Sequence, residues 1–153
     1  MSTATVYDVA KYILDTQGEI TAMKLQKLAF YVKAWALVWE EKEIFPEHFE
    51  AWANGAVSPD LYKMHAGMLY VTSDLFPAAD TSKISEEFKT SADSVLKFYG
   101  QYSAQQLSDI NHQESPWLDA RGDLPLMARS NEEITPAAMF EYYSGLWNDE
   151  GAE

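Results

Sequence analysis

The chain has 153 residues, of which 47% are apolar and 14% aromatic, so it can bury one sizeable core and is not an intrinsically disordered protein. Its 24 acidic residues outnumber 11 basic ones and give a net charge of −13, which argues against direct binding to nucleic acids or anionic membranes. The sequence lacks cysteine, which excludes disulfides, zinc fingers and thiol nucleophiles and fits a cytoplasmic location.

Two helices are predicted at the start of the chain. Thr5, with Asp8 three residues later, forms a capping box, and apolar residues then recur at helical spacing up to Gly18. Thr21 can cap a second helix over about residues 21–40, which is apolar on nearly all of its faces. We expect this second helix to lie buried at the centre of the fold.

A few polar side chains interrupt the second helix. Lys24, Gln26 and Lys27, with Lys33 further along, could form a basic patch for phosphate. A solvated face of the helix explains them better, because two or three lysines do not make a nucleic-acid footprint in a chain this acidic.

Residues 45–57 combine aromatic side chains with Gly55 and are predicted to form a short irregular or β-like segment, either an ordered loop or a strand pair. Beyond it, a hydroxyl residue directly precedes proline three times, at Ser58-Pro59, Ser115-Pro116 and Thr135-Pro136. A helix start needs a side-chain acceptor at its cap and tolerates proline in its first turn, so each dipeptide predicts a helix start.

Two more helices follow from periodicity and capping. Residues 88–99 form an amphipathic helix that Gly100 can close, and Ser103 with Gln106 makes a second capping box. The last helix, after Pro136, ends in an acidic tail at residues 148–153. The prediction is a mainly α protein: one compact domain over residues 1–153, with its core at about 6–147 and six to seven helices around the central one.

Catalytic motifs are scarce. The histidines His48, His65 and His112 lie in separate segments without metal-ligand spacing, and no nucleotide-binding loop or serine-hydrolase elbow occurs, so we expect no cofactor, no metal site and no enzyme activity. One alternative is a hydrolase or metal-dependent enzyme built on His112 and Glu114. A structural interpretation is favoured, in which His112 bonds a loop carbonyl, Ser115 caps a helix and Trp117 packs in the core.

An ordered set of short segments is typical of one protein family. The segments are Tyr7 to Ile13, Thr21 to Tyr31, Trp35, Phe45, Phe49 to Trp52, Gly55 to Pro59 with Leu61 and Tyr62, and His112 with Pro116 and Trp117. In this order they resemble the Panacea antitoxin domain, also called SocA-like or GepA-like, which is often found in phage and prophage genes. The chain departs from the family where Ala56 replaces a usual proline and Asn111 a common threonine.

The resemblance implies an antitoxin of a type II toxin–antitoxin pair that neutralises a cognate protein toxin by direct binding. Toxins paired with this family include nucleotide-transferring enzymes related to alarmone synthetases, and one relative instead delivers its toxin to a bacterial protease. A phage-encoded adaptor that recruits a host protein or protease is therefore a second alternative. Some relatives carry a DNA-binding segment ahead of the domain; here the pattern begins almost at Met1, so we expect no direct contact with DNA.

The expected contact surface lies in the loops before two of the helix-starting prolines, Pro59 and Pro116, where aromatic residues meet helix starts. Trp and Tyr are the residues that most often anchor protein interfaces, and the acidic surface would speed association with a more basic toxin. The residues predicted to bind the partner are Trp52, Gly55, Val57, Tyr62, His112 and Trp117.

Overall fold

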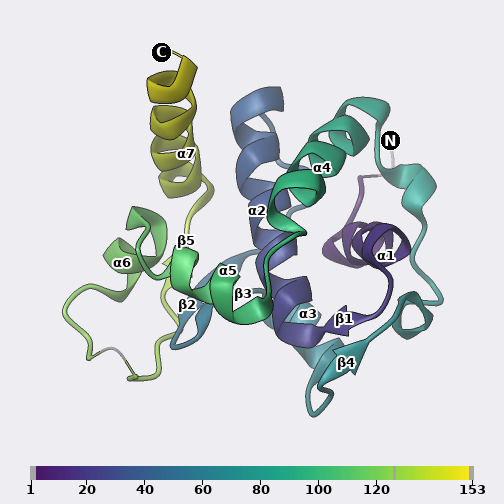
Figure 1. The fold of residues 1–153 in the computed structure, drawn as a ribbon, viewed down its shortest axis with the longest axis horizontal. Helices are drawn as coiled ribbons and strands as arrows, with labels where there is room; N and C mark the ends of the chain where they lie inside the picture. Colours follow the sequence, from purple (N-terminus) through teal and green to yellow (C-terminus); the bar gives the residue numbers. More distant parts are fainter. Residues whose placement is uncertain (1–2, 126, 152–153) are drawn as a thin grey trace.

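The protein folds into a mainly helical domain with two small antiparallel sheets, as Figure 1 shows in a computed structural model that describes residues 3–125 and 127–151. This confirms the predicted fold class. In chain order the elements are α1 (Val6–Gln17), β1 (Ile20–Thr21), α2 (Ala22–Glu40), β2 (Phe49–Trp52), β3 (Gly55–Val57), α3 (Pro59–His65), β4 (Tyr70–Val71), the short 3-10 helices η1 (Ser73–Leu75) and η2 (Thr81–Lys83), α4 (Glu86–Tyr99), α5 (Ala104–Asn111), α6 (Ser115–Arg121), β5 (Glu133–Ile134) and α7 (Pro136–Gly151).

The predicted central helix is α2. It begins after Thr21, whose side-chain oxygen accepts a hydrogen bond from the Lys24 backbone N–H at 3.1 Å, and every residue from Leu25 to Leu37 is buried. In Figure 1, α2 passes between α7 on one side and α4 on the other, and it also packs against α1, α5, β3 and α3. A helix surrounded in this way has no face left for water, which explains its apolar sequence.

Most of the predicted helix starts are confirmed by their caps. Thr5 with Asp8 and Ser103 with Gln106 form complete capping boxes, and Ser58 caps α3. Thr135 accepts a hydrogen bond from the Ala138 backbone N–H at 3.1 Å, directly before α7.

The predicted cap at Ser115 is wrong. Helix α6 begins one residue earlier than expected, at Ser115 itself, and its N-cap is Glu114, which makes no side-chain capping bond. The Glu114 carboxylate accepts hydrogen bonds from two buried tyrosines instead. Pro116 still falls in the first turn of the helix, where a missing backbone N–H costs nothing.

The predicted β-like segment contains the hairpin formed by β2 and β3, in which Ala51 pairs with Ala56 and Trp52 with Gly55. On its other side, β2 pairs with β5, so the strand order is β3-β2-β5. A separate two-stranded sheet joins β1 to β4, where Ile20 faces Val71. These small sheets place the hairpin against α2, α5 and α6, at the lower side of the molecule in Figure 1.

The predicted solvated face of the central helix is wrong for Gln26, Lys27 and Lys33, which are buried. The segment after α2 folds back over the helix and offers polar groups to them. Lys33 donates to the Glu47 backbone oxygen at 2.6 Å and forms an ion pair with Glu43 at 3.2 Å. These lysines therefore hold the chain together internally and do not form a basic surface.

Helix α7 continues to Gly151, so it takes in part of the acidic segment 148–153. Within the described ranges, no helix combines the length and the apolar character needed to cross a membrane.

Candidate binding groove

A groove of about 570 Å³ opens between the β2–β3 hairpin, α3 and the segment that follows α6. Its lining residues are Met23, Gln26, Trp52, Ala53, Asn54, Val57, Tyr62, Arg129, Ser130 and Asn131. Three of the six residues predicted to bind a partner line it: Trp52, Val57 and Tyr62. Of the other three, Gly55 is a buried residue of the hairpin itself, and His112 and Trp117 lie behind the hairpin.

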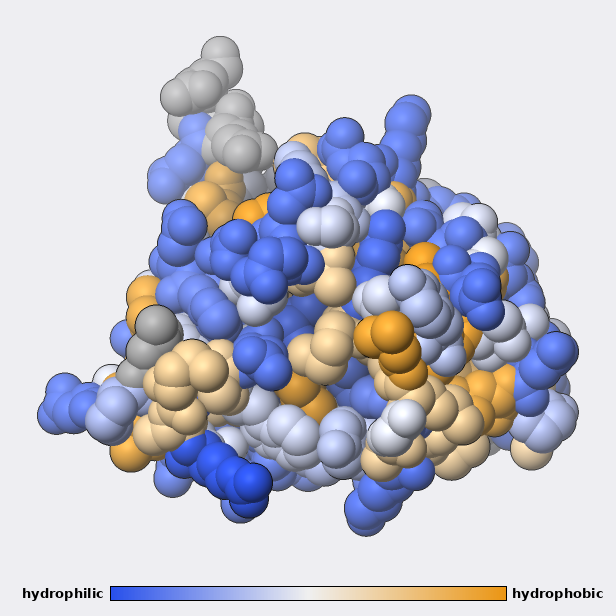
Figure 2. Space-filling view, turned by 60° about the horizontal axis from the view of Figure 1, so that its bottom comes forward, coloured by the Kyte–Doolittle hydropathy of each residue, from blue (hydrophilic) through white to orange (hydrophobic). Residues whose placement is uncertain are grey.

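Exposed apolar residues are frequent in α3 and in the chain that follows it up to Tyr70. Tyr62 is 39% exposed and Leu69 is 69% exposed, and further exposed apolar side chains of the same stretch are Met64, Met68 and Tyr70. Figure 2 turns this lower face forward, and tan and orange side chains interrupt the blue polar surface there. Apolar patches of this kind on a folded domain mark sites of protein contact.

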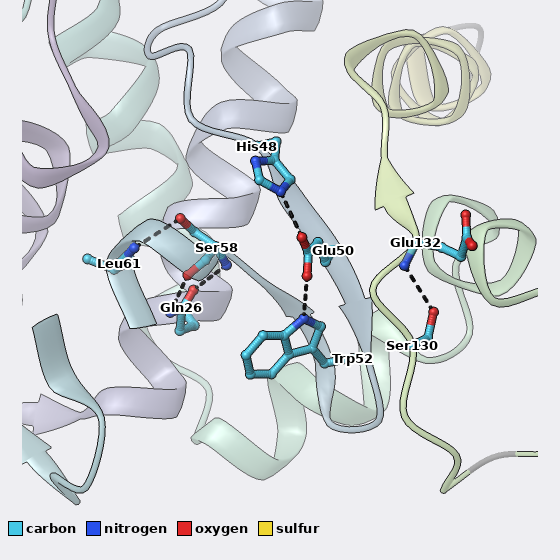
Figure 3. Close-up of polar contacts among 8 residues, drawn as sticks. All are labelled: Gln26, His48, Glu50, Trp52, Ser58, Leu61, Ser130 and Glu132. Carbon is cyan, nitrogen blue, oxygen red and sulfur yellow. Dashed lines mark hydrogen bonds and ion pairs between the residues drawn. The ribbon is translucent and has the colours of Figure 1, made fainter. Parts of the chain in front are cut away.

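Trp52 is held in place by its neighbours on the same strand. Its indole N–H donates to Glu50 Oε1 at 2.9 Å, and the other Glu50 oxygen lies 2.8 Å from His48 Nε2 (Figure 3). Glu50 and Trp52 alternate along β2 and so lie on one face of the sheet, and His48 directly precedes the strand. The Trp52 ring meets the Tyr62 ring edge to face, with centroids 5.1 Å apart. This fixes an aromatic pair at the groove.

Gln26 attaches the start of α3 to the central helix. Its side-chain oxygen accepts from the Ser58 N–H at 2.8 Å, and its amide nitrogen donates to the Ser58 oxygen at 3.2 Å (Figure 3). The same nitrogen lies 2.9 Å from His65 Nε2, and because an amide nitrogen only donates, the imidazole must accept. Burial lowers the pKa of His65, in keeping with this neutral ring. Both ends of α3, and so Tyr62 between them, are thereby fixed.

Lys27 and Asn111 bond the backbone of β3 at Ala56. Lys27 Nζ donates to the Ala56 oxygen at 3.1 Å, and the Ala56 N–H donates to Asn111 Oδ1 at 2.7 Å. Gly55 has a φ of 116°, and a Cβ there would lie 2.6 Å from Lys27 Cε and 2.9 Å from Asn111 Oδ1. Burial lowers the pKa of Lys27 to about 7. Gly55 is therefore required by packing, and it is too enclosed to touch a partner.

The hairpin turn is held by α6. Trp117 is 2% exposed, and its indole N–H donates to the Trp52 backbone oxygen at 2.8 Å. Arg121 donates to the Ala51 oxygen at 3.1 Å, and its guanidinium lies 4.9 Å from the centre of the Trp117 ring. The His112 ring stacks on the same indole at 4.3 Å, and burial lowers its pKa. His112 and Trp117 therefore support the groove from behind and do not line it.

Glu114 lies in the core, 6% exposed. Its Oε1 accepts from the Tyr31 and Tyr143 hydroxyls, both at 2.7 Å. Burial raises the pKa of the carboxyl group, whereas the hydrogen bonds oppose that rise. Burial also raises the pKa of both tyrosines well above the usual value, so they remain donors.

The two residues of the enzyme hypothesis face different neighbours. His112 packs against Trp117, whereas Glu114 lies between the two tyrosines. A second, smaller hollow lies between α6 and α7, and neither His112 nor Glu114 lines it or the groove. In the part of the chain that the structure describes, no group of three or more His, Cys, Asp or Glu side chains is arranged to hold a metal ion. The groove presents aromatic surface and hydrogen-bond donors, which are suited to binding.

Several residues of the groove were not identified from the sequence. They are Met23, Asn54 and the segment from Arg129 to Asn131. This segment reaches the groove because the Ala51 N–H donates to the Glu132 oxygen at 2.9 Å, which extends the β2–β5 pairing. No local pattern marks such a loop, since its position depends on pairing with a strand about 80 residues earlier.

Comparisons with known proteins gave one match. The family described as antitoxin SocA-like, Panacea domain, matches residues 25–118, which is more than half of the chain and runs from α2 into α6. Neither the curated proteins nor the solved structures contained a match. The matched segment includes Lys27, Asn111 and Trp117, which bond the hairpin backbone, and Gln26, which attaches the start of α3. The chain belongs to the SocA-like antitoxin family with the Panacea domain.

Proposed function

We propose that the protein is the antitoxin of a type II toxin–antitoxin pair and neutralises its toxin by binding it directly at the groove. Family membership supports an antitoxin role with a protein toxin as partner. The observation that carries the binding mode is the Trp52–Tyr62 pair, which meets edge to face at the groove beside the exposed apolar stretch after α3. Aromatic anchors of this kind supply most of the binding energy at protein interfaces.

The groove is also well supported from behind. Trp52 and Tyr62 sit on backbone that is held by Trp117 and Gln26, so little side-chain or loop freedom remains to be lost on binding. Exposed methionines nearby, at Met64 and Met68, can adapt their shape to a partner because the thioether chain is unbranched and flexible. A rigid aromatic centre with an adaptable border is suited to a protein partner.

Co-expression with the protein encoded by the adjacent gene tests the proposal. Wild-type protein should rescue growth and copurify with the toxin, whereas Trp52→Ala with Tyr62→Ala should lose both, because truncating aromatic anchors costs on the order of 2 kcal/mol or more each. Circular dichroism checks that the double variant remains helical. Immunoblots of the toxin distinguish inhibition, in which its amount is kept, from delivery to a protease, in which it falls.

Phe98→Ala is the matched control. Phe98 is 54% exposed on α4 and does not line the groove, so its loss removes a similar exposed aromatic elsewhere. This variant should rescue growth fully. Full rescue by the groove variant, or copurification lost equally in the control, would remove the groove from the proposal.

A further inference from the structure

The groove differs in charge from the rest of the molecule. The chain carries a net charge of −13, yet the groove is lined by one arginine, Arg129, and by no aspartate or glutamate. Its other polar lining residues, among them Asn54 and Asn131, are uncharged. Whatever occupies the groove therefore meets a local cation on a strongly acidic protein.

The polar groups of the groove differ in whether their hydrogen-bond donors are already used within the protein. Gln26 is fully occupied by Ser58 and His65, and the Trp52 indole N–H by Glu50. By contrast, Arg129 forms no hydrogen bond or ion pair with any other residue in the described ranges 3–125 and 127–151. The guanidinium keeps its donors available for a ligand.

The backbone on both sides of Arg129 is held in place. The preceding residue, Ala128, accepts a hydrogen bond from the Arg121 guanidinium at 2.8 Å. Beyond it, Ser130 accepts from the Glu132 N–H at 3.2 Å (Figure 3), and the Glu132 oxygen accepts from the Ala51 N–H at 2.9 Å. Trp52 lies between this segment and the Gln26–Ser58 contact in the same view. The side chain of Arg129 is thus carried into the lining of the groove by backbone that is fixed on both sides.

We infer that the groove recognises an acidic–aromatic segment of the protein toxin, with a side-chain carboxylate on Arg129 and the neighbouring apolar ring against Trp52 and Tyr62. This inference rests on the proposed function and specifies which kind of toxin segment binds in the groove. A planar guanidinium beside aromatic walls binds a carboxylate with two parallel N–H···O bonds, and the apolar walls limit the competing water. The acidic surface elsewhere still favours a toxin that is basic overall, so the inference concerns the inserted segment alone.

Three dipeptides test the inference without knowledge of the toxin: acetyl-Asp-Phe-amide, acetyl-Asn-Phe-amide and acetyl-Lys-Phe-amide. Their dissociation constants would be measured by NMR titration of the full chain, following the Trp52 indole N–H signal. The net charge of −13 alone predicts the order Lys, Asn, Asp from tightest to weakest. The groove predicts the reverse order, with the Asp peptide binding about fivefold more tightly than its neutral isostere, as expected for a charge-assisted pair.

Two variants with the same change in charge locate the effect. Arg129→Gln should abolish the preference for Asp over Asn, whereas Lys63→Gln should keep it, since Lys63 lies on α3 and does not line the groove. Raising the salt to about 0.5 M should narrow the preference, because an exposed ion pair is screened.

Equal binding of the three peptides, tighter binding of the Lys peptide, no binding of any, or equal effects of the two variants would each overturn the inference. None of these results depends on growth rescue. If Trp52→Ala with Tyr62→Ala still neutralised the toxin, the proposed function would fail at this groove whichever peptide bound.

Discussion

The two sides of the β2–β3 hairpin differ in the kind of side chain that they contact or present. On the inner side, the hairpin support, made of Lys27, Asn111, Trp117 and Arg121, uses buried polar side chains to bond the hairpin backbone. On the outer side, the groove presents aromatic rings and the Arg129 guanidinium to the surroundings. Buried polar groups are costly unless paired, so changes to the support should lower stability, whereas changes to the groove should lower binding and leave stability nearly unchanged.

Gly55→Ala should show the largest effect. The added Cβ meets Lys27 Cε and Asn111 Oδ1 at under 3.0 Å in a backbone conformation that side chains rarely adopt. We expect a loss of about 3 kcal/mol in the free energy of unfolding, measured by urea denaturation. Gly67→Ala is the control, because Gly67 also has positive φ, 84°, but nothing lies within 4 Å of its Cβ position. A loss no larger than that of the control would contradict the packing role of Gly55.

Lys27 should make stability depend on pH in a particular direction. The pKa of Lys27 is lowered by burial from 10.5 to about 7, so between these values the unfolded chain holds a proton that the native protein has released. Stability must then rise with pH across this window and fall as the pH is lowered toward 7. Relative to Lys27→Met, the wild type should gain about 2 kcal/mol between about pH 7 and about pH 9.

The measurement is urea unfolding of both proteins at several pH values in that range. Groups that titrate in both proteins cancel in the difference. Lys63→Met removes a lysine at an exposed site and should follow the wild type. Parallel pH profiles for wild type and Lys27→Met would show that Lys27 keeps its proton in the native state.

Glu50→Ala should affect stability least. Glu50 orients the Trp52 indole from a partly exposed position on β2, so its loss should change the free energy of unfolding by about 0.5 kcal/mol or less. Toxin binding should weaken roughly fivefold, as expected for one lost hydrogen bond to an anchor. Glu50→Gln keeps an acceptor for the indole and should bind like the wild type; the affinities of all three proteins for the toxin would be compared by isothermal titration calorimetry. A large loss of stability in Glu50→Ala would mean that the groove side also supports the fold.

Features that depend on local contacts could be predicted from the sequence. Helix starts at Thr5, Thr21, Ser58 and Ser103 follow from local chemistry, because a cap and its partner are three residues apart. The central helix follows from its apolar faces alone. Such features need no knowledge of distant contacts.

The wrong predictions concern residues whose partners lie far away in the sequence. Gln26 and Lys27 were placed in solvent because such residues are usually exposed, but the hairpin about 30 residues later supplies their partners. Ser115 does not cap because Glu114 is drawn to Tyr31 and Tyr143 from other helices. Arg129 was overlooked for the same reason. The sequence predicts Trp52 and Tyr62, which line the groove, as binding residues. Local patterns do not separate them from Gly55, a buried residue of the hairpin itself, or from Trp117, which lies behind the hairpin.

The single oxygen of Glu114 that receives both tyrosine hydroxyls has a practical consequence for dissecting this protein. One donor, Tyr31, belongs to α2 and the other, Tyr143, to α7, which lies beyond the family-matched residues 25–118. A fragment cut to those residues would lose one of the two hydroxyl groups that donate to Glu114 and would expose the apolar surface that α7 covers. We therefore expect the chain to need residues beyond the family-matched stretch in order to fold stably.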